Sequence, residues 1–486
     1  MSANAGADAP AGADAGAGAN GEELLGLCRE VLAAAGEAEV EIYARLAERG
    51  CARFAIGELG QHMELVEPQA VVRVAHGRRV AETVTSRLDR AHLVDVVRDT
   101  ARSARLVPEV EGFAGFARAG DGDGPPPAVP PRFVDATARA TPEERVERLA
   151  PVLATIRDAG LVSAGMLETT RSAHAVATTG GCARAHDATF AAFRVWALET
   201  PGAGGAAGYG GHVHRDVRAL RLAEETARAI RVCATSREPA SLDEGTYDVV
   251  MEPEAVTELM EWLAGIAFAA PEVEQGSSPL TGRLGERITG ERITIAEDPL
   301  DASELGFGVP FDREGTWRRR VPLVERGVAR AVLYDRTYAA RAGTTSTGSA
   351  VLPVFGSAGG VGASSLALAA GDAAGVDELL AGVERGLYVC RLHYVNGFLE
   401  PRRAVMTGLT RDGCFLVEKG RIARAVGNMR FTDSFLEGLA RCDAMTRERR
   451  AVPTSWTDAG AFVAPALRIR GWRFNGRSQE RAIPVP

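Results

Sequence analysis

The sequence predicts an α+β protein of two domains, each with an antiparallel or mixed sheet and flanking helices, the C-terminal one mostly β and barrel-like. Three observations lead to this prediction. Short runs that alternate apolar and polar residues, as strands do, recur in both halves of the chain. Helical spacing is confined to a few segments among them. Turn-forming residues cluster at "SREPASLDEG", 236–245, between the two halves.

This cluster sets the expected domain boundary. With 486 residues the chain is long enough for two domains that each bury a core. We expect a disordered Ala/Gly tail at 1–21, an N-terminal α+β domain at 22–237 and a β-rich C-terminal domain at 238–486. The tail has neither a basic start nor an apolar stretch, so it does not resemble an export signal.

The first half begins with an amphipathic helix at 22–35, because Leu24, Cys28 and Val31 share one helical face. Short strands follow at "EVEIYAR", 39–45, and "CARFAIG", 51–57, and "GRR" between "AVVRVAH" and "VAETVTS" indicates a hairpin. A helix is expected at 91–104. The Pro-rich "GDGDGPPPAVPPR" can only be an exposed loop.

The next helix has a clear start signal. Thr141 is its expected cap, Pro142 lies in the first turn, Glu144 reaches back, and Gly160 ends the helix. Strands "SAGMLETT", "AHAVATT" and "CARAHDATFAAFRVWALE" come after it. We interpret "GAGGAAGYGGHVH" as a second Gly-rich loop, followed by helical spacing at 215–233.

The second half opens with the strand "TYDVVM" and a helix that begins at Pro253. Further strands are expected at "RITIAED", "RRRVPLVERG", "VARAVLYD", "YVCRLHYVN", "AVMTGLT", "CFLVEKGRIARAV" and "PALRIRGWRF". Two helices are expected near 374–385 and 434–441. "RDG" and "EKG" are interpreted as turns between neighbouring strands.

Composition excludes several classes of function. The net charge of −8 and the pI near 5.7 argue against a surface that binds nucleic acid. No apolar run is long enough to span a membrane. The seven cysteines contain no C-x-x-C pair, which suits reduced thiols in a cytoplasmic protein rather than a disulfide framework.

"GSAGGVGASSLALAAG" at 356–371 resembles a phosphate-binding loop. Such a loop needs a lysine on the phosphates, but Ala358 and Ala363 occupy the corresponding places, and Lys419 is the only lysine of the chain. We therefore interpret this stretch as a plain Gly/Ser/Ala loop before a helix.

Histidine pairs are candidates for a metal site. His212 and His214 would point to the same side of a strand and could share a metal, but no third ligand is identifiable. His174 and His186 lie in neighbouring strands and could meet there. Polar contacts on a sheet face are the commoner outcome for such a pair.

Two further pairs fail on geometry. Cys390 and His393 have an odd offset, which places them on opposite faces of a strand and prevents a thiol–imidazole dyad. Glu297 and Asp298 are adjacent, whereas glycosidase chemistry needs two carboxyl groups that face each other across a substrate. We expect these carboxylates to cap a loop.

Several motifs in one order resemble the C-terminal half of the TldD/PmbA family, the modulators of DNA gyrase. These are "GTYDVVMEPEAV", "ITIAEDP", "FGVPFDREGTWRRRVPLVERGV", "YDRTYAARAGTTSTGSA", "RGLYVCRLHYVN" and "TGLTRDGCFLVEKGRIARAVGNMRF". The N-terminal half resembles the family less distinctively, so that the resemblance covers roughly residues 22 to 480.

The resemblance implies one of two kinds of chain. The TldD-like kind carries His-Glu-x-x-x-His on a helix, where two imidazoles hold zinc and the Glu activates water. In "TELMEWLAGIAF" those places are Met260, Glu261 and Gly265, so both imidazoles are missing. The family's further ligand, a cysteine, should fall near "AVPTSWTDAG", which contains none, and Cys442 lies upstream.

The resemblance therefore implies a TldE/PmbA-like subunit without catalytic residues, metal or cofactor of its own, paired with a TldD-like subunit that bears the zinc. Such a pair acts in the cytoplasm on peptides, either trimming them or maturing peptide natural products. The peptide-contact or interface candidates are His393, Tyr394, Asn396, Arg411 and Asp412, although for Asp412 a turn is the stronger interpretation.

Two alternatives remain open at the level of sequence. The chain could be a hydrolase with an unrecognised site, for instance at His212 and His214. It could also be a stand-alone peptide-binding or regulatory protein. The sequence does not distinguish housekeeping proteolysis from specialised biosynthesis, nor does it reveal the peptide or whether the chain self-associates.

Overall fold

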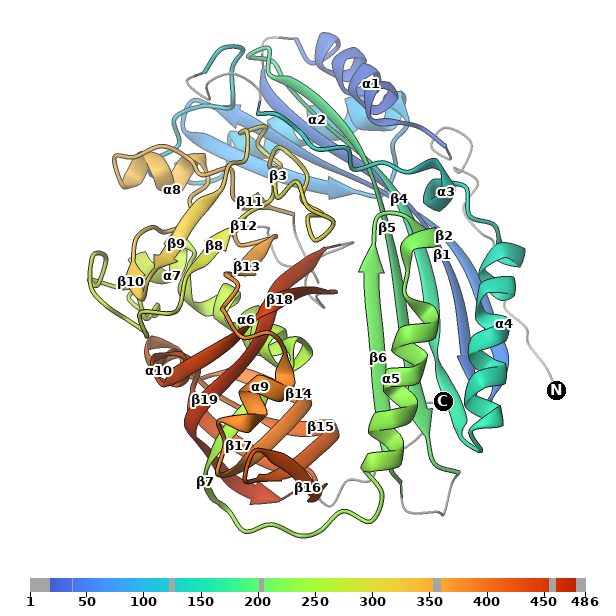
Figure 1. Ribbon diagram of the computed structural model, residues 1–486. Helices are drawn as coiled ribbons and strands as arrows, with labels where there is room; N and C mark the ends of the chain where they lie inside the picture. The colour runs from blue at the N-terminus through green and yellow to red at the C-terminus, as the bar shows by residue number, and fades with distance from the viewer. Residues whose placement is uncertain are drawn as a thin grey trace, which may run out of the picture.

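The computed structural model describes residues 18–36, 38–121, 127–200, 205–352, 360–453 and 460–477. They form two large sheets with helices beside them, which confirms the α+β class (Figure 1). The connection between the sheets, 236–244, contains no helix and only an isolated β-bridge at Ala240. The predicted domain boundary falls in this connection and stays a prediction. Most of the predicted N-terminal tail, 1–17, lies outside the described residues.

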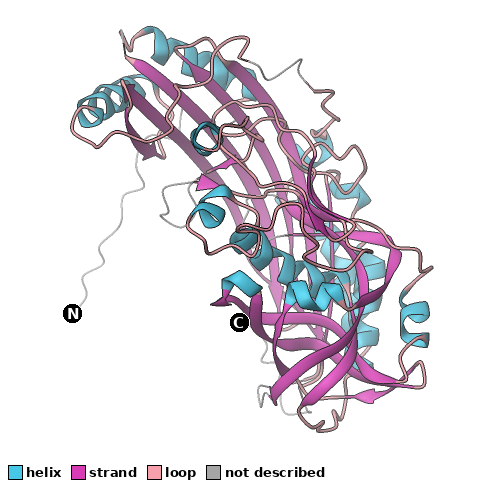
Figure 2. Ribbon diagram, turned by 90° about the vertical axis from the view of Figure 1, so that its left-hand side faces the viewer, coloured by secondary structure: helices cyan, strands magenta, loops and turns pink. Residues whose placement is uncertain are grey.

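The first sheet has six antiparallel strands in the order β3-β2-β1-β4-β5-β6. Figure 2 shows its long, twisted strands running beside the mostly shorter, curved strands of the second sheet. None of the helices among the described residues is long and apolar enough to cross a membrane. The elements of this half are α1 (Gly21–Ala33), β1 (Glu39–Ala55), β2 (Glu58–His76), β3 (Arg79–Thr85), α2 (Arg90–Ala104), α3 (Asp135–Ala138), α4 (Pro142–Asp158), β4 (Val162–Thr178), β5 (Ala183–Leu198), β6 (Ala207–His214) and α5 (Leu222–Thr235).

Several strands are longer than the sequence predicts. The expected strands at 39–45 and 51–57 are one strand, β1, which runs through Gly50. A Cβ at Gly50 would lie 2.3 Å from a guanidinium nitrogen of Arg145, so this glycine makes room for a side chain and does not form a turn. The hairpin around Gly77 is confirmed, because β2 and β3 pair on either side of it.

The predicted Gly-rich loop at 202–214 is wrong where it can be compared, since 207–214 form strand β6, and 201–204 lie outside the described residues. The glycines allow helix α5 to lie directly on this strand. A Cβ at Gly208 would be 2.0 Å from the Ala229 carbonyl oxygen, and one at Gly210 would be 2.2 Å from that of Glu225. Close packing, and not turn formation, explains the glycines here.

Alternation along the strands divides the first sheet into two faces. On β1, Ile42 and Leu46 pack with the α1 and α2 side of the sheet, while Tyr43 between them packs against Phe311 of the second half. Helices α4 and α5 cover another part of the first sheet. They pack against it in the core that contains Leu149 and Phe193. The sheet is therefore a middle layer between its helices and the second half of the chain.

The second sheet is mixed, and five of its strands close into a ring in the order β7-β14-β15-β17-β19, because β19 also pairs with β7. The elements are β7 (Gly245–Met251), α6 (Pro253–Ala267), α7 (Ala270–Glu274), β8 (Ile295–Glu297), β9 (Val321–Glu325), β10 (Val328–Ala329), α8 (Arg336–Arg341), β11 (Ala350–Val351), β12 (Gly360–Val361), β13 (Leu366–Leu368), α9 (Val376–Ala381), β14 (Arg385–Glu400), β15 (Val405–Glu418), β16 (Arg421–Ala425), β17 (Met429–Ser434), α10 (Phe435–Ala440), β18 (Cys442–Pro453) and β19 (Ala461–Arg477).

One of the two predicted turns is wrong. "EKG" does join β15 to β16, with Lys419 and Gly420 at positive φ. "RDG", however, lies inside β15, where Asp412 has φ 51° and Gly413 has φ 121°. A Cβ at Gly413 would be 2.7 Å from the sulfur of Cys390, so the distortion brings the two strands close together without ending β15.

The predicted cap of α4 is confirmed. The Thr141 hydroxyl accepts a hydrogen bond from the Glu144 backbone N–H at 3.2 Å, and the Glu144 carboxylate accepts one from the Thr141 N–H at 3.0 Å. This reciprocal pair satisfies two of the N–H groups that a helix start leaves without partners.

Thr141→Ala should lower the free energy of unfolding by about 1 kcal/mol, because the Glu144 N–H loses its acceptor. Urea denaturation measures the change. Thr155→Ala, an exposed hydroxyl bonded to the Pro151 carbonyl within the same helix, is the matched control and should change stability by less than about 0.5 kcal/mol. Equal effects of the two variants would contradict the capping role.

The histidine pair of β4 and β5 lies where the sequence suggests that it could meet. His174 and His186 are direct partners in the strand register. The Tyr43 hydroxyl lies 2.8 Å from His174 Nδ1, and the Ser172 hydroxyl lies 3.0 Å from Nε2. Burial lowers the pKa of His174 well below its usual value, and burial together with Arg132 lowers the pKa of His186 to about 4.

These shifts predict acid sensitivity. Between pH 6.5 and about 4 the unfolded chain binds a proton at His186 and the folded chain does not, so stability falls as the pH falls through this range. In urea titrations from pH 7 to pH 4.5, His186→Gln should lose less stability than the unaltered chain. The exposed His76→Gln is the control and should follow the unaltered chain. Parallel curves for all three proteins would refute the assignment.

Candidate functional site

Helix α6 carries the motif positions singled out by sequence, and it is a core helix. It follows β7 directly, begins with Pro253 at its first position, and packs against β14, β18 and β19. The apolar face of this helix lies in the main core of the second half. Its residues are Val256, Leu259, Met260 and Leu263.

The motif positions on α6 do not converge on one point. Met260 is 1% exposed and surrounded by core residues, whereas Gly265 is exposed, with no atom within 4 Å of a Cβ built on it. Glu261 is only partly exposed. In this structure an imidazole at 260 would therefore enter the core, whereas one at 265 would face solvent.

Other metal donors are also unsuitable. No group of three or more His, Cys, Asp or Glu among the described residues could hold a metal ion. Of the stretch "AVPTSWTDAG", residues 454–459 lie outside that part of the chain. Cys442 is buried, and burial raises the pKa of its thiol to about 12, which disfavours the thiolate that binds zinc. The residues of this chain do not fit the zinc site of the TldD-like kind.

His212 and His214 point the same way along β6, as their spacing predicts. Their rings are nearly parallel, with centroids 6.5 Å apart. His214 Nδ1 accepts a hydrogen bond from the Asp216 N–H at 2.9 Å. Burial and the nearby Arg221 lower the pKa of His212 to about 4. The described residues supply no third ligand, so the pair does not form a metal site.

The predicted failure of the Cys390–His393 dyad agrees with the structure. Cys390 is buried in a small core with Phe415, and burial raises the pKa of its thiol. The His393 ring lies against the Tyr394 ring, with centroids 4.4 Å apart. A thiol that remains protonated in an apolar core is not a nucleophile.

Glu297 caps a loop, as expected for the Glu297–Asp298 pair. Its carboxylate accepts hydrogen bonds from the Ser364 N–H and hydroxyl, each at 2.9 Å, and from the Ser365 N–H at 3.0 Å. Within the described part of the Gly-rich stretch, 360–371, the N–H groups of Ser364 and Ser365 thus donate hydrogen bonds to a carboxylate of the same chain. The stretch leads into strand β13 and not, as expected, into a helix.

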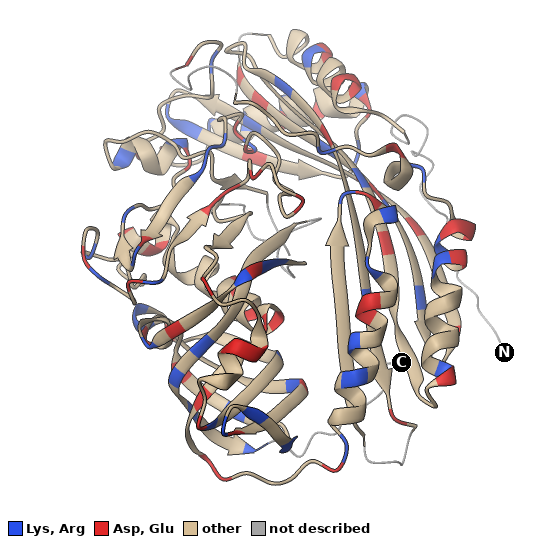
Figure 3. Ribbon diagram, viewed as in Figure 1, with Lys and Arg blue, Asp and Glu red and all other residues tan. Residues whose placement is uncertain are grey.

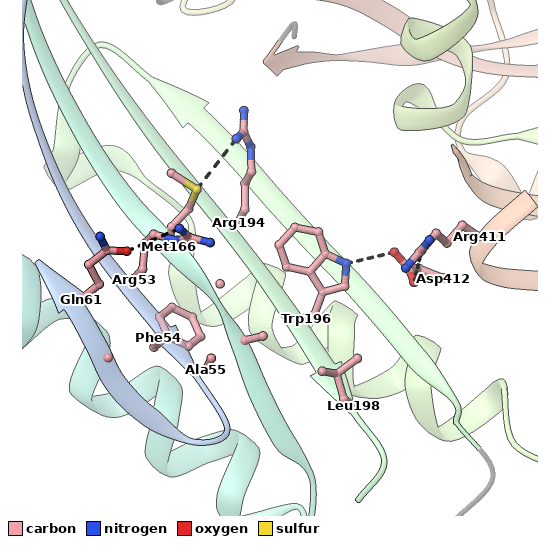
Figure 4. Close-up of a pocket in the computed structure, with 13 residues that line it drawn as sticks. Arg53, Phe54, Ala55, Gln61, Met166, Arg194, Trp196, Leu198, Arg411 and Asp412 are labelled. Atoms are coloured by element: carbon pink, nitrogen blue, oxygen red, sulfur yellow. Dashed lines mark hydrogen bonds and ion pairs between the residues drawn. The ribbon is translucent and has the colours of Figure 1, made fainter. Parts of the chain in front are cut away.

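A cavity of about 380 Å³ lies between the first sheet and strand β15 (Figure 4). Its floor is a row of side chains in direct register across four strands, from Gln61 on β2 through Arg53 on β1 and Met166 on β4 to Arg194 on β5. Directly opposed residues point to the same face of a sheet. Trp196 on β5 and Arg411 with Asp412 on β15 complete the wall.

Asp412 joins the two halves of the chain at this cavity. Its Oδ2 accepts a hydrogen bond from Trp196 Nε1 at 2.9 Å and one from Arg391 Nη1 at 2.5 Å. The Arg391 guanidinium in turn lies over the rings of Tyr209 and Trp196, at 4.2 Å and 5.5 Å from their centroids. Two of the five residues nominated from sequence, Arg411 and Asp412, thus line the cavity.

The other three nominated residues lie elsewhere, on β14. Tyr394 is 74% exposed with φ 52°, and Asn396 accepts a hydrogen bond from the Phe398 N–H. His393 contacts Tyr394, as described above. An exposed apolar patch continues beyond them, and Trp262 of α6 packs edge-on against its Phe398 at 5.1 Å. This β14 patch consists of Tyr394, Phe398 and Leu399.

A buried charge seam connects α5 to the start of α6. Arg228 on α5 pairs with Glu254 at 2.9 Å, and Arg450 on β18 pairs with both Glu225 and Glu254. The Tyr388 hydroxyl donates to Glu252 at the edge of the seam. Figure 3 shows acidic and basic residues interspersed over both halves, with no single basic face.

The residues of the first sheet that line the cavity were not predicted from the sequence. Arg53 and Arg194 are separated by more than a hundred residues in the sequence. They and Met166 come together only through the pairing of β1, β4 and β5. The single local signal was Trp196, a large aromatic residue with a polar group in a predicted strand.

Comparison with solved structures shows the same fold elsewhere. TldE from Thermococcus kodakarensis superposes with a TM-score of 0.81 at 18% sequence identity, covering 90% of this chain and 97% of that one. This likeness concerns the fold alone.

Comparison by sequence identifies the family. A "Metalloprotease" of Methanothermobacter thermautotrophicus is 29% identical over 51% of this chain and 54% of its own length. A "Metalloprotease TldD homolog" of Haemophilus influenzae is 24% identical over 46% of this chain and 45% of its own. These matches span about half the length of each relative. Residues 244–476 match the model of the PmbA/TldA metallopeptidase C-terminal domain, which identifies this part of the chain as a domain of the PmbA/TldD metallopeptidase family.

Proposed function

We propose that this chain is a non-catalytic, TldE/PmbA-like subunit of a heterodimeric zinc metallopeptidase. It pairs with a TldD-like subunit that bears the zinc and helps to enclose and position peptides for trimming or maturation. The observation that carries this proposal is the burial of Met260 in the core at the place of the first zinc-binding histidine, with Gly265 in place of the second.

Coordination chemistry supports a division of labour. A hydrolytic zinc site needs three protein ligands and an open position for water. On α6, one ligand position holds a buried thioether and the other has no side chain, so Glu261 has no metal-bound water to deprotonate. The partner subunit must then supply both the zinc and the general base.

The β14 patch is the proposed contact with that subunit. Exposed apolar residues that are close together on a soluble protein mark interaction sites, and Tyr394, Phe398 at 67% and Leu399 at 52% are exposed on one short segment of β14. The patch continues through Trp262 onto α6, the helix that differs between the two kinds of subunit. Contact here would place this chain beside the partner's own motif helix.

The cavity beside Arg411 and Asp412 is the proposed peptide-facing part of this chain. It opens between the sheets and combines apolar with cationic side chains, as ligand sites do. The complex is proposed to act in the cytoplasm, where reduced thiols such as the seven buried cysteines persist.

Peptidase assays with a co-expressed TldD-like protein test the proposal. Neither subunit alone should cleave an unfolded peptide, and the purified pair should. Tyr394→Ser combined with Phe398→Ser should weaken the complex at least ten-fold by isothermal titration calorimetry, because the apolar contact area is lost.

Ile422→Ser is the matched control, since it removes an exposed apolar side chain from β16, away from the patch. It should leave the affinity unchanged. The proposal of a paired subunit fails if no complex forms, and the assignment of the patch fails if both sets of variants bind equally well.

Restoring the histidines should not restore a zinc site. In Met260→His combined with Gly265→His, one imidazole enters the core and the other points to solvent, so the two do not meet at one metal ion. Elemental analysis should find far less than one zinc per folded chain. One tightly bound zinc per chain would show that the two positions can converge, contrary to the packing of α6.

A further inference from the structure

We propose that the cavity between the first sheet and β15 binds the C-terminal carboxylate of a peptide together with its last, apolar side chain. This inference rests on the proposed function in taking a peptide as the ligand. It goes further in naming which end of the peptide is held and which residues hold it.

Three guanidinium groups line the cavity, and none of them has a carboxylate within 3.5 Å among the described residues. In that part of the chain, the Arg53 side chain makes a single polar contact, with the Gln61 amide at 3.5 Å, and Arg194 makes a single one, with the Met166 sulfur at 3.9 Å. Arg411 lies 3.8 Å from the Asp412 carboxylate. These contacts are long and weak for a cation, so all three groups remain able to bind an anion.

Asp412 offsets only part of this charge, because its single carboxylate faces Arg391 as well as Arg411. Arg391 and the Trp196 indole N–H both donate to Oδ2, and Arg391 stays on its own side between the Tyr209 and Trp196 rings. The chain carries a net charge of −8, and many of its other arginines contact carboxylates within 3.6 Å. A local surplus of positive charge in such a protein points to an anionic ligand.

The row across the strands sets the spacing of these charges. Arg53 on β1 and Arg194 on β5 flank Met166 on β4, so their backbones are two strand spacings apart, roughly 10 Å. Figure 4 shows Arg53 and Met166 on one side of the cavity, Trp196 at its centre and Arg411 with Asp412 on the opposite side. A carboxylate that enters between them meets cationic groups from both halves of the chain.

The rest of the lining is apolar. Phe54, Met166, Trp196 and Leu198 offer aromatic, thioether and aliphatic surface beside the guanidinium groups. A volume of about 380 Å³ lies near the lower end of the roughly 300–1,000 Å³ found for ligand pockets, which suits the end of a peptide and not a long segment. In a C-terminal residue, a carboxylate and a side chain share one α-carbon, so a single residue matches both parts of the lining.

Phosphate ligands fit this lining less well. Phosphate sites use backbone N–H groups at helix starts or in glycine-rich loops. The floor here lies within strands, where Arg53, Met166 and Arg194 are each in ladder register with their neighbours. Planar guanidinium groups beside apolar surface suit a carboxylate, which arginine can bind through two parallel hydrogen bonds.

Fluorescence anisotropy with labelled peptides tests the proposal on the purified full chain. The probe is Gly-Ala-Ala-Leu-Phe with fluorescein at its N-terminus, as the free acid and as the C-terminal amide. The free acid should bind at least ten-fold more tightly. Replacing the terminal Phe by Ser should also weaken binding, because the apolar wall then loses its contact.

Variants separate the cavity from general charge effects. Arg194→Gln combined with Arg411→Gln should weaken binding of the free acid at least ten-fold and leave the weak binding of the amide unchanged. Arg424→Gln, which removes an equal charge from exposed strand β16, should have no effect. The arginines of the variants lie on the surface of the cavity, and circular dichroism verifies that the variants fold.

Several outcomes would overturn the proposal. It fails if free acid and amide bind equally, if neither binds at millimolar concentration, or if the double variant binds like the unaltered chain. It also fails if inorganic phosphate or adenosine monophosphate displaces the probe at lower concentration than acetyl-phenylalanine does. The binding assay uses this chain alone, so its result does not depend on whether the chain pairs with a zinc-bearing subunit.

Discussion

Helix α6 must bury most of its surface, and the rest of the C-terminal half is arranged around that requirement. Eleven of its residues are buried, and only one stripe, made of Glu258, Glu261, Trp262 and Gly265, is less buried. The ring of β7, β14, β15, β17 and β19 provides that core, because β19 returns to pair with β7 and leaves no open edge between them. Met260 is one of the residues that this packing places out of reach of solvent and metal.

The start of the same helix is tied to the N-terminal half through charge. Glu252 and Glu254 precede or open α6, and Arg228 and Arg450 face them from α5 and β18. Burying these ions is unfavourable unless each one has a partner, and removing one partner of a buried pair costs about 3–5 kcal/mol. The seam therefore favours a single alignment of the two halves, and with it the alignment of Trp196 and Asp412 across the cavity.

Features of the fold that depend on a few neighbouring residues could be predicted from the sequence. The Thr141 cap, the hairpin at Gly77 and the start of α6 at Pro253 each depend on a few neighbouring residues, and each is found as expected. Glycine is an ambiguous signal, because the same residue occurs in turns and where two elements pack closely. Gly208 and Gly210 in β6 were interpreted as loop residues, but they make room for a helix that the sequence pattern does not place beside them.

The candidate site shows the same limit. Arg411 and Asp412 were nominated through the family motif around them, and they do lie at the cavity. Arg53, Met166 and Arg194 become neighbours only when the strand register is known, and a shift of one residue would turn each to the other face. The "RDG" pattern indicates an unusual backbone at Asp412, which does have a positive φ, but it does not show that β15 continues through this residue.

The central claim is that the residues of this chain cannot hold a hydrolytic zinc. The most direct measurement is the metal content of the chain purified without any companion, after equilibration with micromolar zinc and removal of the excess. We expect well below one zinc per chain, without cleavage of an unfolded peptide. One firmly retained zinc per chain together with peptide hydrolysis would contradict the claim.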